Sequence, residues 1–239
     1  MKKFATTLIL AMACIAAVQA QTADEIIDNY FEIIGGKDAW RNIEIVKMSG
    51  KAQVQGLEFP MTITMKKPGK VYQEIEFNGK KMVQAFDGTT GWAINPMAMQ
   101  MEPTKLPEDQ LEQFEDLKVE DELLDYAGKG HSVAYEGTED VSGTNCHKIK
   151  LTKKSGDVEY HFFDTDSGIK IMQRSFVKSG PAEGQAAETY MSSYDEVNGL
   201  YFPFEMESRV QGQTVFQAVM TSISIDADVS DDLFAFPEK

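Results

Sequence analysis

Short segments in which apolar and polar residues alternate, joined by tight turn sequences, constrain this chain more than any other feature. Side chains on a β-strand point to the two faces of a sheet in turn, so a period of two residues predicts strands. The first such segments lie between residues 46 and 95, and the dipeptides Asn78-Gly79 and Asp87-Gly88 are among their connections. Connections this short predict antiparallel neighbours, here a meander of about five strands.

The same alternation returns after Gly130 and continues to Ile225. Turn dipeptides recur along it, including Ser142-Gly143 and Asn198-Gly199. Together with the first group, the pattern predicts about eleven strands. We find no linker and no repeat, so residues 21–239 are expected to form one domain.

Two stretches have helical rather than strand periodicity. Residues 22–34 place acidic side chains in a first turn and apolar ones on a single face, and two glycines follow; residues 37–42 predict a further short turn of helix. Between residues 103 and 127, leucines and Phe114 recur at helical spacing among many acidic residues. We predict an amphipathic, strongly acidic helical segment there, formed by one helix or by two with a break near Val119.

The first twenty residues predict a secretory signal peptide. Lys2 and Lys3 form a basic start, residues 8–18 are apolar, and Ala20 closes a small-residue cleavage site. We therefore expect export to the periplasm, with residues 1–20 removed before Gln21. A membrane anchor and a lipoprotein lipidated at Cys14 are the alternatives.

The charge balance and the missing motifs limit the classes of function. With 38 acidic against 23 basic residues, the chain has a net charge of −15, which argues against binding nucleic acid or anionic lipid headgroups. Cys146 is the one cysteine after residue 20, so no intramolecular disulfide is expected in the exported chain. No nucleophile, phosphate-binding or zinc motif occurs. The sequence predicts no enzyme and no cofactor.

Metal ligands are likewise not expected. His131 and His161 have no partner at metal-ligand spacing, and His147 shares an apolar strand pattern with Ile149. Residues 164–168 resemble the start of a calcium loop, but Ser175 occupies the twelfth position, where such loops carry glutamate. We interpret these five residues as a β-turn.

Several short motifs resemble those of the LolA-like lipoprotein localisation factors, bacterial periplasmic carriers, and of the related outer-membrane receptors (LolB). Residues 87–100 match the D-G-x-T-x-W-x-x-x-P segment of that family, and Lys66-Lys67-Pro68 resembles the end of one of its earlier strands. Residues 163–168 and 233–237 resemble a later turn and the C-terminal tail. The resemblance covers nearly the whole chain after residue 20.

This resemblance implies an incomplete antiparallel β-barrel whose apolar concave face is covered by a lid of helices. It also implies a carrier that takes lipoprotein acyl chains across the periplasm to the outer membrane. The family's carriers place an arginine linked to lid closure immediately before the proline, whereas this chain has Lys67. Lysine lacks the planar fork that bonds several carbonyls at once. We predict that Lys67 lies at the rim, where it can hold a lid carbonyl or an acidic side chain; the alternative is an ordinary solvated lysine at the end of a strand.

The predicted cavity is lined by large apolar side chains, many of them methionine, from alternating strand positions. Methionine is flexible and polarisable, so it suits a surface that accepts varied apolar partners, although it also fills gaps in ordinary cores. The predicted lining is Phe59, Met61, Ile63, Met65, Met82, Phe86, Trp92, Phe202, Phe204, Met206, Phe216 and Met220. The predicted lid side chains are Ile27, Phe31, Leu111 and Phe114.

The function we expect is binding of lipoprotein acyl chains. Each buried methylene contributes about 0.8 kcal/mol, so a sixteen-carbon chain gains roughly 13 kcal/mol, and a bilayer offers nearly the same. Such a carrier therefore needs an inner-membrane complex that releases the cargo and an outer-membrane acceptor that takes it. The alternatives are a LolA-like binder of another lipid or hydrophobic small molecule, and a structural or interaction protein with a packed core.

Overall fold

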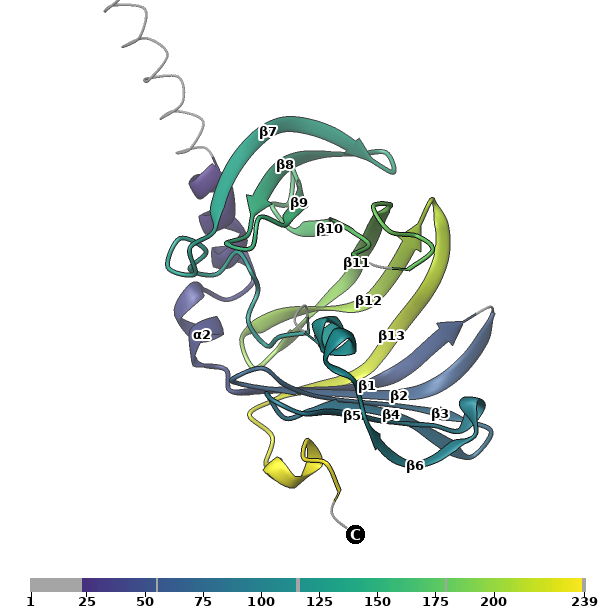
Figure 1. Cartoon of the computed structure of the whole chain (residues 1–239). Helices are drawn as coiled ribbons and strands as arrows, with labels where there is room; N and C mark the ends of the chain where they lie inside the picture. The colour runs from purple at the N-terminus through teal and green to yellow at the C-terminus, as the bar shows by residue number, and fades with distance from the viewer. Residues whose placement is uncertain (1–22, 55, 115–116, 179, 238–239) are drawn as a thin grey trace, which may run out of the picture. The chain divides into compact units, whose positions relative to one another are not determined.

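The computed structural model describes residues 23–54, 56–114, 117–178 and 180–237 (Figure 1). The predicted signal peptide and Cys14 lie outside these residues. Among the described residues, no helix combines the length and the apolar composition needed to span a bilayer.

Thirteen strands form one antiparallel sheet, in the order β6-β5-β4-β3-β2-β1-β13-β12-β11-β10-β9-β8-β7. The sheet is open, with β6 and β7 at its two edges, and it fits an incomplete β-barrel. The strands are β1 Ile45–Val54, β2 Leu57–Lys66, β3 Lys70–Phe77, β4 Lys80–Phe86, β5 Gly91–Asn95, β6 Gln100–Lys105, β7 Ser132–Val141, β8 Thr144–Thr152, β9 Val158–Asp164, β10 Lys170–Phe176, β11 Ala186–Val197, β12 Leu200–Val210 and β13 Gln213–Ile225.

The strand count is higher than the predicted value of about eleven. One strand that the prediction did not contain is β6, Gln100–Lys105, part of which the prediction placed in a helical segment. This strand has no apolar alternation and contains Pro103, which is tolerated because an edge strand has one unpaired side. Its sequence therefore carries little strand signal.

The described chain divides into two compact units. The first unit is the described part of Met1–Lys37 with Glu122–Met191 and Ser208–Gln213, and the second unit is Asp38–Asp121 with Ser192–Glu207 and Thr214–Lys239. Strands β11, β12 and β13 contribute residues to both units.

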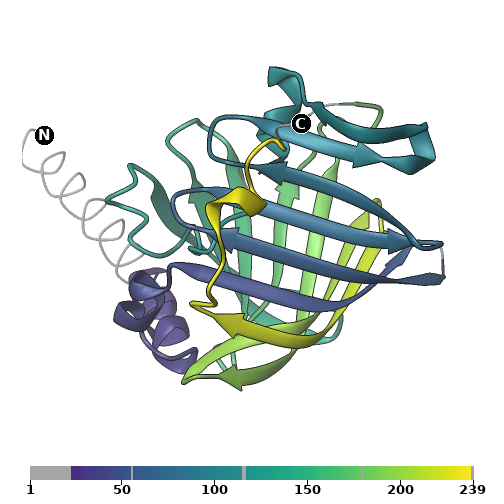
Figure 2. The ribbon, with the colours of Figure 1, turned by 90° about the horizontal axis from the view of Figure 1, so that it is seen from below.

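In the second unit, β1 to β5 form the predicted meander, whose blue strands lie side by side in Figure 2. The turn between β4 and β5 is made as its sequence indicates: Gly88 has a φ of 99°, and Asp87 Oδ1 accepts hydrogen bonds from the backbone N–H groups of Thr89 and Thr90 at 2.8 and 2.7 Å. A left-handed glycine and a capping aspartate reverse the chain at low cost. This hairpin prediction is confirmed.

The first unit contains the predicted N-terminal helix, which spans residues 23–33. Its Tyr30 ring lies 5.1 Å from the ring of Phe163 on β9. Ile27 and Phe31 of the same helix are 1% and 0% exposed. The helix is therefore held by packing of its apolar side. The short helix α2, Lys37–Asn42, is also confirmed; from Asp38 onward it belongs to the second unit.

The second helical prediction is wrong for the described residues of 103–127. Residues 108–114 form a 3₁₀-helix, η2 Glu108–Phe114, and residues 122–130 are a series of turns in which Asp125 has a φ of 52°. Acidic side chains four positions apart, such as Glu108 and Glu112, repel one another along an α-helix. The spaced leucines thus make separate packing contacts and do not form one face of an α-helix. A helical lid is not shown.

Candidate functional site

The candidate site is one face of the sheet in the second unit. Strand partners in an antiparallel ladder carry side chains on the same face. Met61 lies opposite Gly50 and Ile75, Ile75 lies opposite Met82, and Gly50 lies opposite Met220 on β13. Followed along the strands, this face carries Phe59, Met61, Ile63, Met65, Met82, Phe86, Phe216 and Met220. We call it the methionine-rich face.

The methionine-rich face combines deeply buried and partly exposed side chains. Met61 and Met220 are each 4% exposed, and Ile63 and Met65 are each 9% exposed. Phe59 and Met82 are half-buried. The register thus joins eight of the twelve predicted lining residues in one largely apolar surface that crosses β13 and β1 to β4 and also carries the paired amides of Gln73 and Gln84.

Trp92 does not belong to this surface. Gly91 lies opposite Phe86, so Trp92 lies opposite Ala85 and points to the other face of the sheet. There its Nε1–H donates to the carbonyl oxygen of Phe234 at 2.9 Å. Alternation predicts which residues share a face within a strand, but the turn sets the register between strands, and a slip of one residue reverses the face. Grouping Trp92 with Phe86 was therefore wrong.

Phe202, Phe204 and Met206 alternate along β12 and share one of its faces. The ring of Phe202 lies 4.8 Å from that of Trp40 in α2. Phe202 is 6% exposed, so this end of β12 is packed against the short helix.

The η2 segment covers one corner of the methionine-rich face. The rings of Phe114 and Phe86 are stacked, with centroids 5.3 Å apart and planes 8° apart. A Cβ atom added at Gly91 would lie 2.5 Å from Leu111 Cδ2, so the absence of a side chain on glycine leaves room for Leu111. Two of the predicted lid residues therefore contact the sheet, although they come from a 3₁₀-helix.

The other two predicted lid residues, Ile27 and Phe31, are buried in the helix of the first unit. The Phe31 ring lies 5.2 Å from that of Tyr30 and has Lys37 Nζ above it at 5.7 Å. Their contacts within this unit are those of a packed helix.

Lys67 lies between two polar partners of the second unit. Its Nζ donates to the carbonyl oxygen of Arg41 at 2.7 Å and lies 3.9 Å from Glu120 Oε2. The carbonyl thus belongs to the end of α2, and the carboxylate belongs to the acidic stretch that follows η2. The side chain of Lys67 is 21% exposed, so this weak ion pair is partly shielded from water.

A hollow of about 250 Å³ opens beside β3 to β5 in the second unit. Met82 is the predicted lining residue that it touches, and much of the remaining lining is amide: Gln73, Gln84, Asn95, Gln100 and Gln110. Ligand pockets usually enclose 300–1,000 Å³ and are mostly apolar. As it stands, this hollow is too small and too polar to enclose a long hydrocarbon chain.

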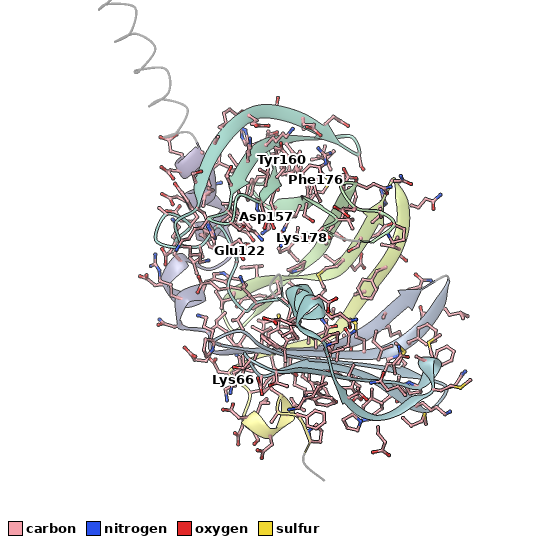
Figure 3. All side chains as sticks on the ribbon, viewed as in Figure 1. Lys66, Glu122, Asp157, Tyr160, Phe176 and Lys178 are labelled. Carbon is pink, nitrogen blue, oxygen red and sulfur yellow. The ribbon has the colours of Figure 1, made fainter. Side chains whose placement is uncertain are left out.

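The first unit holds a buried ionic cluster that the sequence interpretation missed. Glu159 is 4% exposed, and its carboxylate lies 2.6 Å from Lys153 Nζ and 3.5 Å from His161 Nε2. Lys153 Nζ is also 4.0 Å from Glu122, which Figure 3 labels. Burial alone would raise the pKa of Glu159, but the hydrogen bonds and charges of His161 and Lys153 outweigh burial and lower it to about 2. The strand alternation could have indicated this cluster, because it places Glu159 on the same face of β9 as His161 and Phe163.

A cavity of about 440 Å³ lies in the first unit between the N-terminal helix and the turn after β9. Asp164 in that turn accepts hydrogen bonds from the Asp166 N–H at 3.1 Å and the Ser167 hydroxyl at 2.6 Å. The Ser167 hydroxyl in particular lowers the pKa of Asp164. Its carboxylate thus closes a β-turn, as predicted. Among the described residues, no group of three His, Cys, Asp or Glu side chains could hold a metal ion.

Three solved structures resemble this chain over most of its length. A DUF1329 family protein from Desulfovibrio piger has a TM-score of 0.59 at 14% identity, covering 91% of this chain and 97% of its own. A LolA superfamily protein from Nitrosomonas europaea has a TM-score of 0.57 at 12% identity, covering 89% and 97%. A domain from Vibrio parahaemolyticus assigned to outer-membrane lipoprotein sorting has a TM-score of 0.52 at 9% identity, covering 87% and 97%.

At these identities the likeness concerns the fold. No protein-family model matches the sequence, and no curated protein matches it. The likeness to the LolA superfamily that the short motifs predict is therefore found in the three-dimensional structure.

Proposed function

We propose that this protein is a non-enzymatic periplasmic carrier that binds the acyl chains of lipoproteins on the methionine-rich face and delivers them to the outer membrane. The observation that carries the proposal is the apolar surface that strand register assembles from β13 and β1 to β4. The fold shared with a LolA superfamily protein supports it.

The composition of this face suits a hydrocarbon ligand of variable shape. Four of its eight residues are methionine: Met61, Met65, Met82 and Met220. A thioether chain with three rotatable bonds can repack around different ligands without leaving large voids. A face of β-branched side chains would have less freedom to do so.

Opening of the η2 corner is the step that we propose admits the ligand. At that corner Phe114 stacks on Phe86 and Leu111 packs against Gly91, so an acyl chain that contacts Phe86 must displace them. Ligand binding would shift the equilibrium between covered and uncovered forms. Lys67, between Arg41 and Glu120, is the proposed rim contact that favours the covered form.

Because a bilayer holds an acyl chain about as well as such a face does, the proposal includes two partners. An inner-membrane complex releases the lipoprotein to the carrier, and an outer-membrane acceptor removes it. The chemistry required of this protein is reversible shielding of the chain from water.

A fluorescent fatty acid titrated into the purified protein tests the proposal. Ile63→Asn places an amide on the methionine-rich face, opposite Gln73. We expect at least about fivefold weaker binding, because covering an amide with a hydrocarbon chain costs about 1–3 kcal/mol. Thr62→Asn is the matched control, since Thr62 is the preceding residue of β2 and points to the opposite face. Thermal unfolding of both variants shows whether they remain folded.

Saturable binding that Ile63→Asn weakens and Thr62→Asn leaves unchanged would support the site. If the unmodified protein takes up no fatty acid, or a folded Ile63→Asn protein binds as well as the control, the proposal is wrong and a packed structural protein is favoured. Native mass spectrometry of material purified from the periplasm then identifies the cargo. Lipoprotein supports the full proposal, whereas another lipid or a small apolar molecule limits it to the binding step.

A further inference from the structure

The tip of the β5–β6 hairpin exposes three methionines within five residues. Met97, Met99 and Met101 are 66%, 91% and 54% exposed. We call these three side chains the methionine tip. Single exposed apolar residues are common on proteins, but a cluster calls for an explanation.

The backbone of the tip is well fixed although its side chains are exposed. Asn95 Oδ1 accepts hydrogen bonds from the N–H groups of Met97 and Ala98 at 3.1 and 3.3 Å. Met99 adopts a left-handed conformation with a φ of 59°, and its N–H donates to the Pro96 carbonyl at 3.2 Å. An asparagine cap and a turn hydrogen bond thus hold the three α-carbons in one arrangement.

This arrangement allows the three sulfur atoms to reach one point. α-Carbons two residues apart are separated by at most about 7 Å, and the turn brings the chain back on itself between Asn95 and its partner Gln100. Each methionine has three rotatable bonds beyond its backbone to place its sulfur. The side chain of Gln100 is already engaged, because its Nε2 donates to the Ala93 carbonyl at 2.9 Å.

Three neutral thioethers form a soft donor set, and soft ligands select Cu(I) over hard divalent cations. We propose that the methionine tip is a binding site for Cu(I), with the sulfur atoms of Met97, Met99 and Met101 as its ligands. The net charge of −15 favours the approach of a cation. Binding involves no change of oxidation state and does not depend on the proposed lipid function.

Every large exposed apolar side chain of the tip is a thioether, the kind of donor that selects Cu(I). Leucine, isoleucine or phenylalanine would offer a membrane or protein partner as much apolar surface, yet all three exposed positions carry sulfur. Ala98 and Gln100, which lie between them, add no large apolar surface. What distinguishes the tip is therefore the thioether.

The test is an anaerobic titration of Cu(I) in competition with bicinchoninate, a coloured Cu(I) chelator. The full-length chain carries Cys14→Ala and Cys146→Ala, so that neither thiol binds the metal. We expect it to withdraw one equivalent of Cu(I) from the chelator. A variant that also carries Met97→Leu, Met99→Leu and Met101→Leu, which conserve volume and apolar character, should lose at least nine tenths of that capacity.

Met172→Leu in the same background is the control, because Met172 is a buried methionine of the first unit that is 1% exposed. It should bind Cu(I) as its parent does. A second measurement uses Ag(I) as a probe, which should shift the ¹³C-methyl signals of Met97, Met99 and Met101 and leave that of Met172 in place. Failure to withdraw Cu(I), or equal binding by the triple leucine variant, would overturn the proposal. A third result would also overturn it: the parent chain takes up no Cu(I), and both the parent and the triple leucine variant bind phosphatidylcholine vesicles. That result would assign the tip to a membrane contact.

Discussion

The two compact units use the same antiparallel strands in different ways. In the second unit, the methionine-rich face presents apolar side chains that interact without fixed direction. The first unit combines a fully buried apolar core with directional interactions: Arg174 pairs with Glu139 at 3.0 Å and with Glu188 at 2.8 Å, and Lys153 pairs with buried Glu159 at 2.6 Å. We infer that these ion pairs favour one arrangement of the first unit, and we propose that the methionine-rich face of the second unit accepts more than one.

The difference between ion pairs and thioether packing indicates which unit suits an apolar ligand. Buried ion pairs lose much of their energy when either partner moves, because the charge left behind is desolvated. Thioether and aromatic side chains lose little when they slide to a new packing. We therefore propose that cargo binds to the second unit, and the following predictions test this difference between the units.

The largest effect is expected in the first unit. Lys153→Met removes the cation beside Glu159, and breaking a buried pair in this way should lower the free energy of unfolding by about 3–5 kcal/mol. Urea denaturation measures the loss. Lys178→Met is the matched control, because Lys178 forms an ion pair with Asp157; Figure 3 labels both residues. The Lys178 Nζ lies 3.3 Å from the carboxylate, and the lysine side chain is 38% exposed, so loss of this pair should cost less than about 1 kcal/mol. Equal stability of the two variants would contradict the inference that the buried Lys153–Glu159 pair stabilises the first unit.

Acid should act on the same cluster. The folded pKa of Glu159 is about 2, below its ordinary value of 4.5, so its stabilising contribution is complete above pH 4.5 and is lost as the pH falls toward 2. Urea denaturation at a series of pH values should show the free energy of unfolding falling across this range. The fall should be smaller in Glu159→Gln, and an identical pH profile for this variant would show that Glu159 is not responsible.

An intermediate effect is expected at the corner of the methionine-rich face. Gly91→Ala places a Cβ atom 2.5 Å from Leu111 Cδ2, so Leu111 must move, and the free energy of unfolding should fall by about 1–3 kcal/mol. Fatty-acid uptake, followed by stopped-flow fluorescence, should become faster because the η2 segment is loosened.

The double variant Gly91→Ala/Leu111→Ala removes the clash and serves as the control. Its loss of stability should be smaller than the sum of the two single losses, which a double-mutant cycle measures. Additive losses would mean that Leu111 does not sit at Gly91 in solution.

The smallest effect is expected at the rim. Lys67→Met removes the donor to the Arg41 carbonyl and the charge 3.9 Å from Glu120, interactions that together should contribute no more than about 1 kcal/mol. We expect a few-fold faster fatty-acid uptake, most evident at low salt. Lys51→Met is the control, because its partner Glu58 lies on the neighbouring strand and both side chains are more than half exposed. Uptake that Lys67→Met leaves unchanged would remove Lys67 from the closing step.

Much of the fold could be predicted because its signals are local. The alternation of β2 and the Asp87-Gly88 turn depend on residues a few positions apart, and both appear as expected. The η2 segment shows the limit of such reasoning. Leu111 and Phe114 have helical spacing, yet Leu111 packs at Gly91 and Phe114 stacks on Phe86, and helical periodicity does not predict either contact.

Most of the strands, their turns, the acidic balance and the supply of methionine and phenylalanine side chains could be read from the sequence, because each depends on neighbouring residues or on composition. Which of these side chains share a surface depends on the tertiary structure. The pairing of β1 with β13 joins Gly50 to Met220, and the register of β4 with β5 sends Trp92 to the opposite face from Phe86. The first of these registers joins strands far apart in the sequence, and the second depends on the geometry of the turn between β4 and β5. Alternation within each strand determines neither.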